Sequence, residues 1–212
     1  MGNGGTSPRC KKASTHRWIG KTVAIIASGP SLTKEQCDYV RKSGWKTIAI
    51  NTSYKLAPWA DVIYGCDGAW WHQNHRNLPE EAEKWTQDKN AHINLGVNYV
   101  EAKWGAGLNT KTKPHIQIHH GKNSGYQAIN LAYHWGVSRI ILLGYDMQHT
   151  RGKAHWFGDH PKSLTNAHGI EGWVKDFAFL ARDLKSEGVQ VFNCSPETAL
   201  TCFERVELEH LD

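Results

Sequence analysis

The chain has 212 residues, of which 40% are hydrophobic and 21% are charged, and this composition excludes a largely disordered polypeptide. Its formal net charge of +5 mildly favours an anionic partner such as a nucleotide, a sugar phosphate or a nucleic acid. No apolar run reaches the roughly 20 residues that a membrane span needs, and the five cysteines show no C-x-x-C spacing. We therefore expect a cytoplasmic protein without membrane contact, disulfide framework or structural zinc site.

The first half of the chain predicts strands that alternate with helices. Residues 1–18 read as a flexible basic tail, and residues 19–212 read as one domain. Short β-rich runs predict strands at 21–28, 46–51 and 61–66, and helical patterns predict helices at 33–43, 68–75 and 80–89. Residues 91–121 predict two or three short strands around a Gly-rich loop at Trp104.

The second half continues the alternation. It predicts a helix at 124–135, a strand at 139–143, a long loop at 145–169, an amphipathic helix at 170–186, a strand at 189–193 and a helix start at 195–198. Strands that alternate with helices form right-handed βαβ units and a mostly parallel sheet. The predicted class is therefore a three-layer α/β fold with a long active-site loop.

Small or hydrogen-bonding residues follow the predicted strands. Because ligands of open parallel sheets bind at the carboxyl ends of the strands, these positions predict a nucleotide-type site. Gly29 and Gly125 let backbone approach a ligand, and the helix N-termini behind Ser31 and Ser124 offer N–H groups to phosphate. A helix cap without a ligand is the alternative explanation for each position. The chain has neither G-x-G-x-x-G after its first strand nor a G-x-x-x-x-G-K-[ST] loop, which argues against a usual dinucleotide-binding or P-loop protein.

Five segments together resemble a known framework. They are IIASGPSL at 25–32, IN at 50–51, NSGY at 123–126, ILLGYD at 141–146 and NCSPETAL at 193–200. This series resembles the single-domain, Rossmann-like bacterial sialyltransferases. It is also similar to the pterin diphosphokinase-like superfamily, which includes motility accessory factors and many phage proteins. The similarity spans about residues 22–203 and implies a Rossmann-like fold. It also implies that the protein acts in a bacterial or phage-infected cell.

The resemblance implies roles for individual residues. Ser28, Gly29, Pro30 and Ser31 are expected at the phosphates or ribose, and Asn51 at ribose or phosphate. Asn123, Ser124 and Gly125 are expected at phosphate, Tyr145 near a leaving phosphate, and Asn193, Cys194 and Ser195 at the base. Asp146 is expected either at the nucleotide or in a structural role that holds loop backbone.

The predicted long loop carries the expected catalytic groups. By the same resemblance, His155 or His160 is the general base that deprotonates an acceptor hydroxyl, because an imidazole titrates near neutral pH. Arg151 and Lys153 are placed to steady a departing phosphate. The expected activity is a nucleotide-dependent transferase, most like a glycosyltransferase with a nucleotide-sugar donor, and its acceptor is a glycan, a small molecule or DNA.

Two alternatives stay open. Asp67 stands where the sialyltransferase pattern has an amide, and its carboxylate suits Mg²⁺, which favours a diphosphokinase that uses ATP; capping of a helix explains Asp67 equally well. The other alternative is a non-catalytic nucleotide or nucleic-acid binding protein. The loop histidines lack the i, i+4 spacing of a helical zinc site. Trp70, Trp71, Trp104 and Trp156 are candidates either for stacking on a ligand or for packing.

Overall fold

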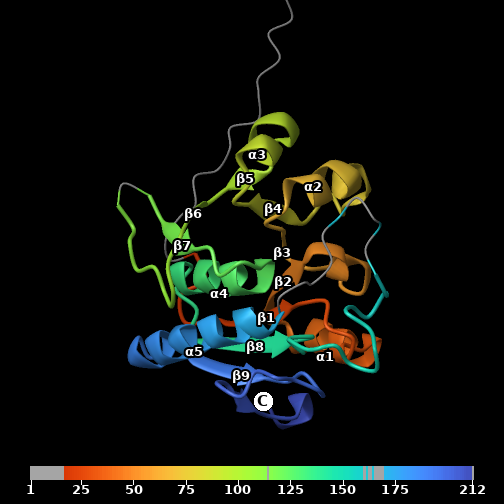
Figure 1. Ribbon diagram of the computed structural model, residues 1–212, viewed down its shortest axis with the longest axis vertical. Coiled ribbons are helices and arrows are strands. Elements are labelled where there is room, and N and C mark those ends of the chain that lie inside the picture. Colours follow the sequence, from red (N-terminus) through yellow and green to blue (C-terminus); the bar gives the residue numbers. More distant parts are fainter. Residues whose placement is uncertain (1–16, 114, 160, 162–163, 165–169, 212) are drawn as a thin grey trace, which may run out of the picture.

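The computed structural model describes residues 17–113, 115–159, 161, 164 and 170–211 (Figure 1). The strands are β1 (Thr22–Ile26), β2 (Lys46–Ile50), β3 (Val62–Tyr64), β4 (Glu83–Thr86), β5 (Asn98–Tyr99), β6 (Glu101–Lys103), β7 (Gln117–His119), β8 (Arg139–Leu143), β9 (Gln190–Asn193) and β10 (Glu204–Arg205). The α-helices are α1 (Lys34–Ser43), α2 (Gly68–Asn74), α3 (Lys89–Leu95), α4 (Ser124–His134) and α5 (Ile170–Ser186). Short 3₁₀ turns lie at Asn51–Lys55, His75–Asn77 and Leu208–His210.

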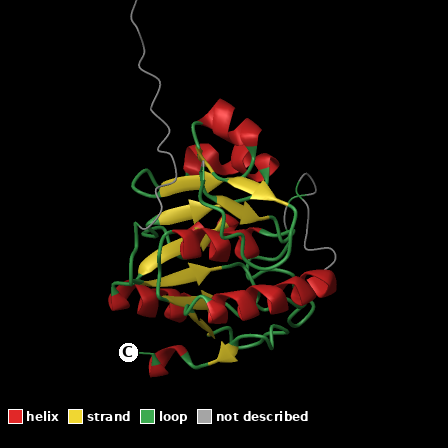
Figure 2. Cartoon of the chain, turned by 90° about the vertical axis from the view of Figure 1, so that its left-hand side faces the viewer, coloured by secondary structure: helices red, strands yellow, loops and turns green. Residues whose placement is uncertain are grey.

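Eight strands form one parallel sheet in the order β10-β9-β8-β1-β2-β3-β4-β5. From β1 the chain first adds strands on one side, through β2 and β3, and later adds β8 and β9 on the other side. This reversal is the topological switch point of a Rossmann-like fold, and it lies between β1 and β8. The predicted α/β class with a mostly parallel sheet is therefore confirmed (Figures 1 and 2).

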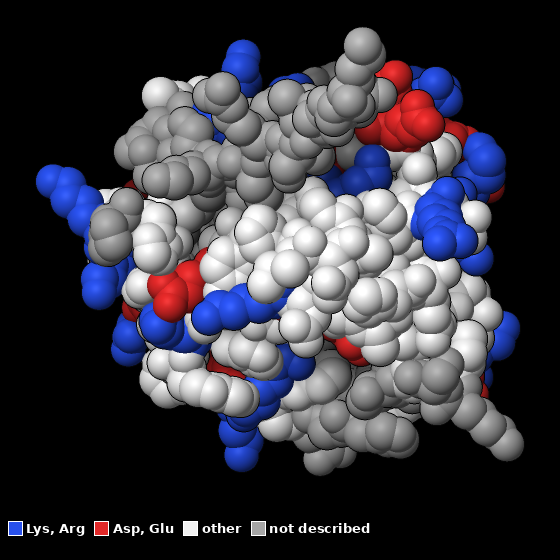
Figure 3. Space-filling model, turned by 90° about the horizontal axis from the view of Figure 1, so that it is seen from above, with Lys and Arg blue, Asp and Glu red and all other residues white. Residues whose placement is uncertain are grey.

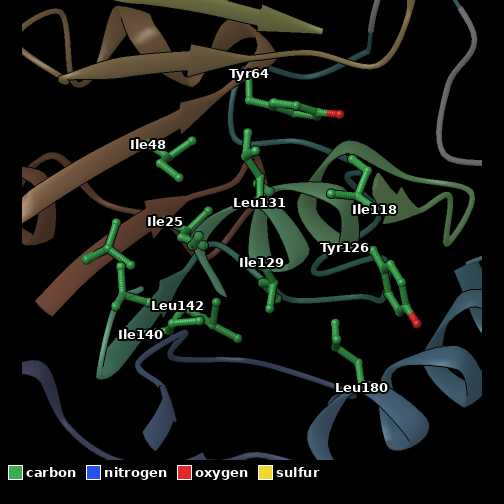
Figure 4. Close-up of a cluster of buried hydrophobic side chains, with 14 of the residues drawn as sticks. Ile25, Ile48, Tyr64, Ile118, Tyr126, Ile129, Leu131, Ile140, Leu142 and Leu180 are labelled. Atoms are coloured by element: carbon green, nitrogen blue, oxygen red, sulfur yellow. The ribbon is translucent and has the colours of Figure 1, made fainter. Parts of the chain in front are cut away.

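Helices cover both faces of the sheet because its central strands are apolar on both sides. Val23 and Ile25 of β1 pack with α4 and α5, whereas Ala24 and Ile26 pack with α1 and α2. This alternation follows from the two-residue period of a strand. Figure 4 shows Ile129 and Leu131 of α4 among side chains of the sheet and of α5. A helix buried in this way is held in a fixed position, and so is its N-terminus.

Several predicted elements are confirmed, and their boundaries follow from local chemistry. Helix α1 begins at a capping box in which the Thr33 side chain accepts from the Gln36 N–H, and it ends at Gly44 with φ of 67°. Helix α5 and strand β8 span the predicted residues. None of the described helices combines the length and apolar character needed to cross a membrane.

The predicted helix at 80–89 is wrong, since β4 occupies Glu83–Thr86 and pairs with β3. Glu, Lys and Ala give this segment a helical propensity, but tertiary packing overrides it. Trp85 is 1% exposed and lies edge-on against Trp135, with ring centroids 5.5 Å apart. Burial of Trp85 in the sheet outweighs the weak local preference.

The predicted helix start at 195–198 is also wrong. Asn193 Oδ1 accepts from the Ser195 N–H at 3.0 Å, and Asn193 Nδ2 donates to Thr198 Oγ1 at 3.0 Å. These side-chain bonds hold a turn in place of a helix. Within 91–121, the expected short strands occur as β5, β6 and β7, whereas α3 was not predicted.

Candidate functional site

A cavity of about 400 Å³ opens at the carboxyl ends of β1, β2, β3 and β8. This is the switch point of the sheet, where ligands of Rossmann-like proteins bind. Its wall contains Ala27, Ser28, Gly29, Ile50, Asn51, Cys66, Asp67, Gln87, His120, Lys122, Asn123, Ser124, Gly125, Gly144, Tyr145, Asp146, Met147, Gln148, Ala154, His155, Ile170 and Trp173.

The N-terminus of α4 forms one side of this cavity. Asn123 caps the helix by accepting from the Tyr126 N–H at 2.8 Å. The N–H groups of Ser124 and Gly125 belong to the first turn, where a helix has no intrahelical acceptors. They give this wall a partial positive charge that favours an anion.

Gly125 is required by the packing of Tyr145. A Cβ atom at Gly125 would lie 2.9 Å from the Tyr145 ring, and the Tyr145 hydroxyl donates to the Gly125 carbonyl at 3.1 Å. Burial raises the pKa of Tyr145, which keeps the phenol neutral. Gly125 therefore serves helix packing as well as the cavity wall.

A serine and a histidine meet in the wall of the same cavity. The hydroxyl of Ser28, just after β1, lies 3.0 Å from Nδ1 of His155 in the long loop. The loop is anchored there because the Trp156 N–H donates to the Ser28 carbonyl at 3.0 Å. Phe157 stacks on the imidazole with a centroid distance of 5.0 Å and an interplanar angle of 10°. These contacts fix the position of the His155 ring relative to Ser28.

Asp146 joins the turn after β1 to the loop after β8. Its carboxylate is 1% exposed and accepts from the Ser31 N–H at 2.8 Å, the Ser31 hydroxyl at 2.7 Å and the Thr150 hydroxyl at 3.0 Å. Burial raises the pKa of Asp146, and these three hydrogen bonds oppose that rise. The donors of Ser31 thus point to Asp146, which acts as the structural link that was one of its two expected roles.

Unusual backbone geometry gathers around the cavity. Four non-glycine residues in the described chain have positive φ, and three of them, Asn51 (47°), Lys122 (62°) and Met147 (48°), line the cavity wall. Such conformations cost free energy and cluster at ligand sites. Asn51 Oδ1 is also buried without a hydrogen-bond partner among the described residues, although native proteins pair most such atoms.

The structure brings together some of the residues singled out in the sequence and leaves others apart. The wall of the cavity contains Ser28, Gly29, Asn51, Asp67, Asn123, Ser124, Gly125, Tyr145, Asp146 and His155. Outside this wall lie Pro30, Ser31, Arg151, Asn193, Cys194 and Ser195. His160 lies outside the described residues.

Several of the predicted site residues have partners within the protein. Arg151 is exposed and pairs with Glu197 at 3.2 Å. Ser195 Oγ accepts from the Tyr145 N–H at 2.7 Å. Asp67 caps α2 by accepting from the Ala69 N–H at 2.9 Å, and no cluster of three metal-ligating side chains occurs among the described residues.

Some wall residues were missed in the sequence. Gln87, which donates to the Cys66 carbonyl at 2.9 Å, was missed because its segment was predicted as a helix. His120 and Lys122 also line the cavity. They lie within four residues before the predicted helix start at Ser124, and this closeness in sequence could have identified them as wall residues. Burial lowers the pKa of His120, which favours its neutral form.

The four candidate tryptophans differ in environment. Trp70 and Trp71 are 2% and 0% exposed and belong to the core, so of the two expected roles they have packing. Trp156 is half-buried and packs against the same core cluster. Trp104 is 78% exposed and stacks on His120 with ring centroids 4.6 Å apart.

We predict that Gly29→Ala disrupts the cavity wall. The new Cβ would lie 2.1 Å from Asp146 Oδ1 and 2.5 Å from the Gly144 carbonyl oxygen, so backbone must move. We expect the free energy of unfolding to fall by about 1–3 kcal/mol in urea titrations. The matched control is Gly172→Ala in α5, where a Cβ meets open space and a gain of about 0.5–1 kcal/mol is expected. Equal stability of the two variants would contradict this account of Gly29.

Comparisons with known proteins returned structural matches alone, since no family model and no curated protein matches the chain. One matching structure is YwfH, an NADPH-dependent reductase involved in bacilysin biosynthesis, with 12% identity, 82% of this chain and 72% of that chain covered, and a TM-score of 0.27. Another is a short-chain dehydrogenase/reductase from Serratia marcescens, with 15% identity, 84% and 74% coverage, and a TM-score of 0.29. The fold class of this chain is established by its strand order.

The prediction of a transferase is corrected by the positions of the residues on which it rested. The residues that the transferase resemblance placed at phosphate and base, Ser31 and Asn193–Ser195, lie outside the cavity wall and bond to the protein itself. These residues hold the loops together by hydrogen bonds, and this role in the fold accounts for their presence in the sequence.

Proposed function

We propose that this chain is an enzyme that binds a nucleotide-type small molecule in the cavity, with a phosphate group at the N-terminus of α4. The single observation that carries the proposal is the position of this helix end in the wall of the switch-point cavity. A phosphate there would accept from the N–H groups of Ser124 and Gly125, in a site that the helix dipole already favours for anions.

The surroundings of the helix end agree with an anionic ligand. Lys122 lies in the same wall next to α4, and its ammonium group pairs with the Asp176 carboxylate at 3.4 Å. Asn51 supplies an amide whose Nδ2 lies 3.4 Å from Ser124 Oγ and whose Oδ1 has no partner among the described residues. An amide carries both a donor and an acceptor, which suits a ribose or a base.

The size of the cavity favours a small ligand. Its volume of about 400 Å³ lies in the range of small-molecule sites. On the face in Figure 3, Lys and Arg side chains lie around an uncharged centre.

His155 is the side chain that we assign to proton transfer in this enzyme. It lines the cavity, and its ring is held by the Ser28 contact and by stacking on Phe157. An imidazole exchanges protons near neutral pH, as a general acid or base requires.

Calorimetric titration of the full chain tests the binding proposal. The probes are AMP, GMP, CMP, UMP and NADPH, the last because one matching structure is an NADPH-dependent reductase. We expect one or more of these nucleotides to bind at least about tenfold more tightly than its phosphate-free nucleoside, a difference of about 1.4 kcal/mol. Lys122→Gln should weaken this binding, whereas Lys55→Gln, on an exposed residue outside the cavity wall, should leave it unchanged. Absence of binding by all five nucleotides, or equal affinity for nucleotide and nucleoside, would contradict the proposal.

A further inference from the structure

We infer that Ser28 is a nucleophile that His155 activates, and that the enzyme hydrolyses a phosphate ester in this cavity through a covalent phosphoserine. The nucleotide character of that ester rests on the proposed function above, whereas the reactivity of the Ser28–His155 pair does not.

The geometry of the pair suits nucleophilic catalysis. An unassisted serine hydroxyl is a weak nucleophile and needs a base within about 2.6–3.2 Å to accept its proton. Ser28 Oγ lies 3.0 Å from His155 Nδ1, within this range. Both residues line the same cavity, so the hydroxyl and its base face one ligand space.

The protein also holds the base in position. In nucleophilic catalysis a third group usually orients the base. The Trp156 N–H bonds to the Ser28 carbonyl, and this hydrogen bond attaches the loop of the base to the residue that carries the nucleophile. Stacking on Phe157 restricts rotation of the imidazole. Ser28 follows a strand whose four final residues are fully buried, so its own backbone has a rigid support.

Groups that stabilise developing negative charge share the cavity wall. They are the first-turn N–H groups of α4 and the ammonium group of Lys122, which also pairs with Asp176 at 3.4 Å. Such donors act most strongly where charge grows in the transition state of phosphoryl transfer.

The proposed reaction has two steps. Ser28 Oγ attacks phosphorus, its proton passes to His155 Nδ1, and the bond between phosphorus and the leaving oxygen breaks with its electron pair on that oxygen, which takes the proton from His155. Water then attacks the phosphoserine, gives a proton to His155, and releases phosphate as the Ser28 oxygen regains that proton. No oxidant or metal ion enters this balance.

Labelling with diisopropyl fluorophosphate tests the pair without a nucleotide. In this probe Ser28 Oγ displaces fluoride at phosphorus, and peptide mass spectrometry locates the adduct. We expect one dominant adduct on Ser28, loss of that adduct in Ser28→Ala, and a labelling rate about 100-fold lower in His155→Gln, in line with the usual gain from general-base catalysis. Ser138→Ala, on an exposed serine outside the cavity wall, is the control that should label as the wild type does.

Each other outcome overturns the inference. Absence of an adduct on Ser28, or an adduct at other serines at equal rates, removes Ser28 as a nucleophile. An adduct on Ser28 that forms equally fast in His155→Gln, with circular dichroism confirming a folded variant, removes His155 as its base. Failure of nucleotide binding in the calorimetric titration would not produce either result, so the two proposals fail separately.

Discussion

Replacement of Asp146 by alanine is expected to lower the free energy of unfolding by about 3 kcal/mol, because buried donors lose their acceptor. The carboxylate accepts three hydrogen bonds, two from Ser31 and one from Thr150, and Asp146 is only 1% exposed. The cost of burying the carboxylate offsets part of this contribution, which keeps the loss below the sum of three bonds. For a chain of this length the melting temperature should fall by about 6–12 °C.

Urea and thermal unfolding of Asp146→Ala measure this effect. The matched control is Asp38→Asn, which removes a carboxylate that pairs with Lys34 on the exposed surface of α1. Surface ion pairs contribute little, so this variant should stay within about 0.5 kcal/mol of the wild type. A loss below about 1 kcal/mol for Asp146→Ala would show that the link between the two loops does not stabilise the fold.

Replacement of Trp135 by alanine is the second change with a large expected effect. Trp135 is fully buried at the end of α4, with its ring edge-on to Trp18 at 4.6 Å and to Trp85 at 5.5 Å. Its removal leaves a cavity among large rings, and we expect a loss of about 3–5 kcal/mol in the free energy of unfolding.

The same substitution at Trp104 provides the control for Trp135. Trp104 is 78% exposed, and its described aromatic contact is the stack on His120. We expect Trp104→Ala to cost less than about 1 kcal/mol, since little apolar area returns to water. Losses of equal size in the two variants, measured by urea titration, would contradict the assignment of Trp135 to the core.

The sequence predicted those elements whose local and tertiary preferences agree. Strand β8 and helix α5 match their predicted residues because each carries one clear apolar pattern. Strand β4 was not predicted because its residues favour a helix. The contact that favours the strand joins Trp85 to Trp135, which is 50 residues further along the chain. Local propensity is weaker than such burial.

The location of the candidate site could be predicted from the sequence, but the role of each residue in it could not. The rule that ligands bind at the carboxyl ends of parallel strands located the turns after β1, β2, β3 and β8, and these turns do line one cavity. Two pairings could not be predicted: Ser31 donates to Asp146, 115 residues further along the chain, and Ser195 accepts from Tyr145. Long-range pairing decides which polar groups face a ligand and which hold the loops together.

Amide NMR of the labelled chain measures whether a phosphate of the ligand lies at the N-terminus of α4. Addition of a nucleotide that binds in the calorimetric titration should shift the Ser124 and Gly125 amide resonances in a saturable manner. The matching nucleoside should shift them much less, because the helix end recognises the phosphate. Saturable shifts confined to other parts of the chain, such as the shallow depression at Asn90 and Lys103, would contradict the claim.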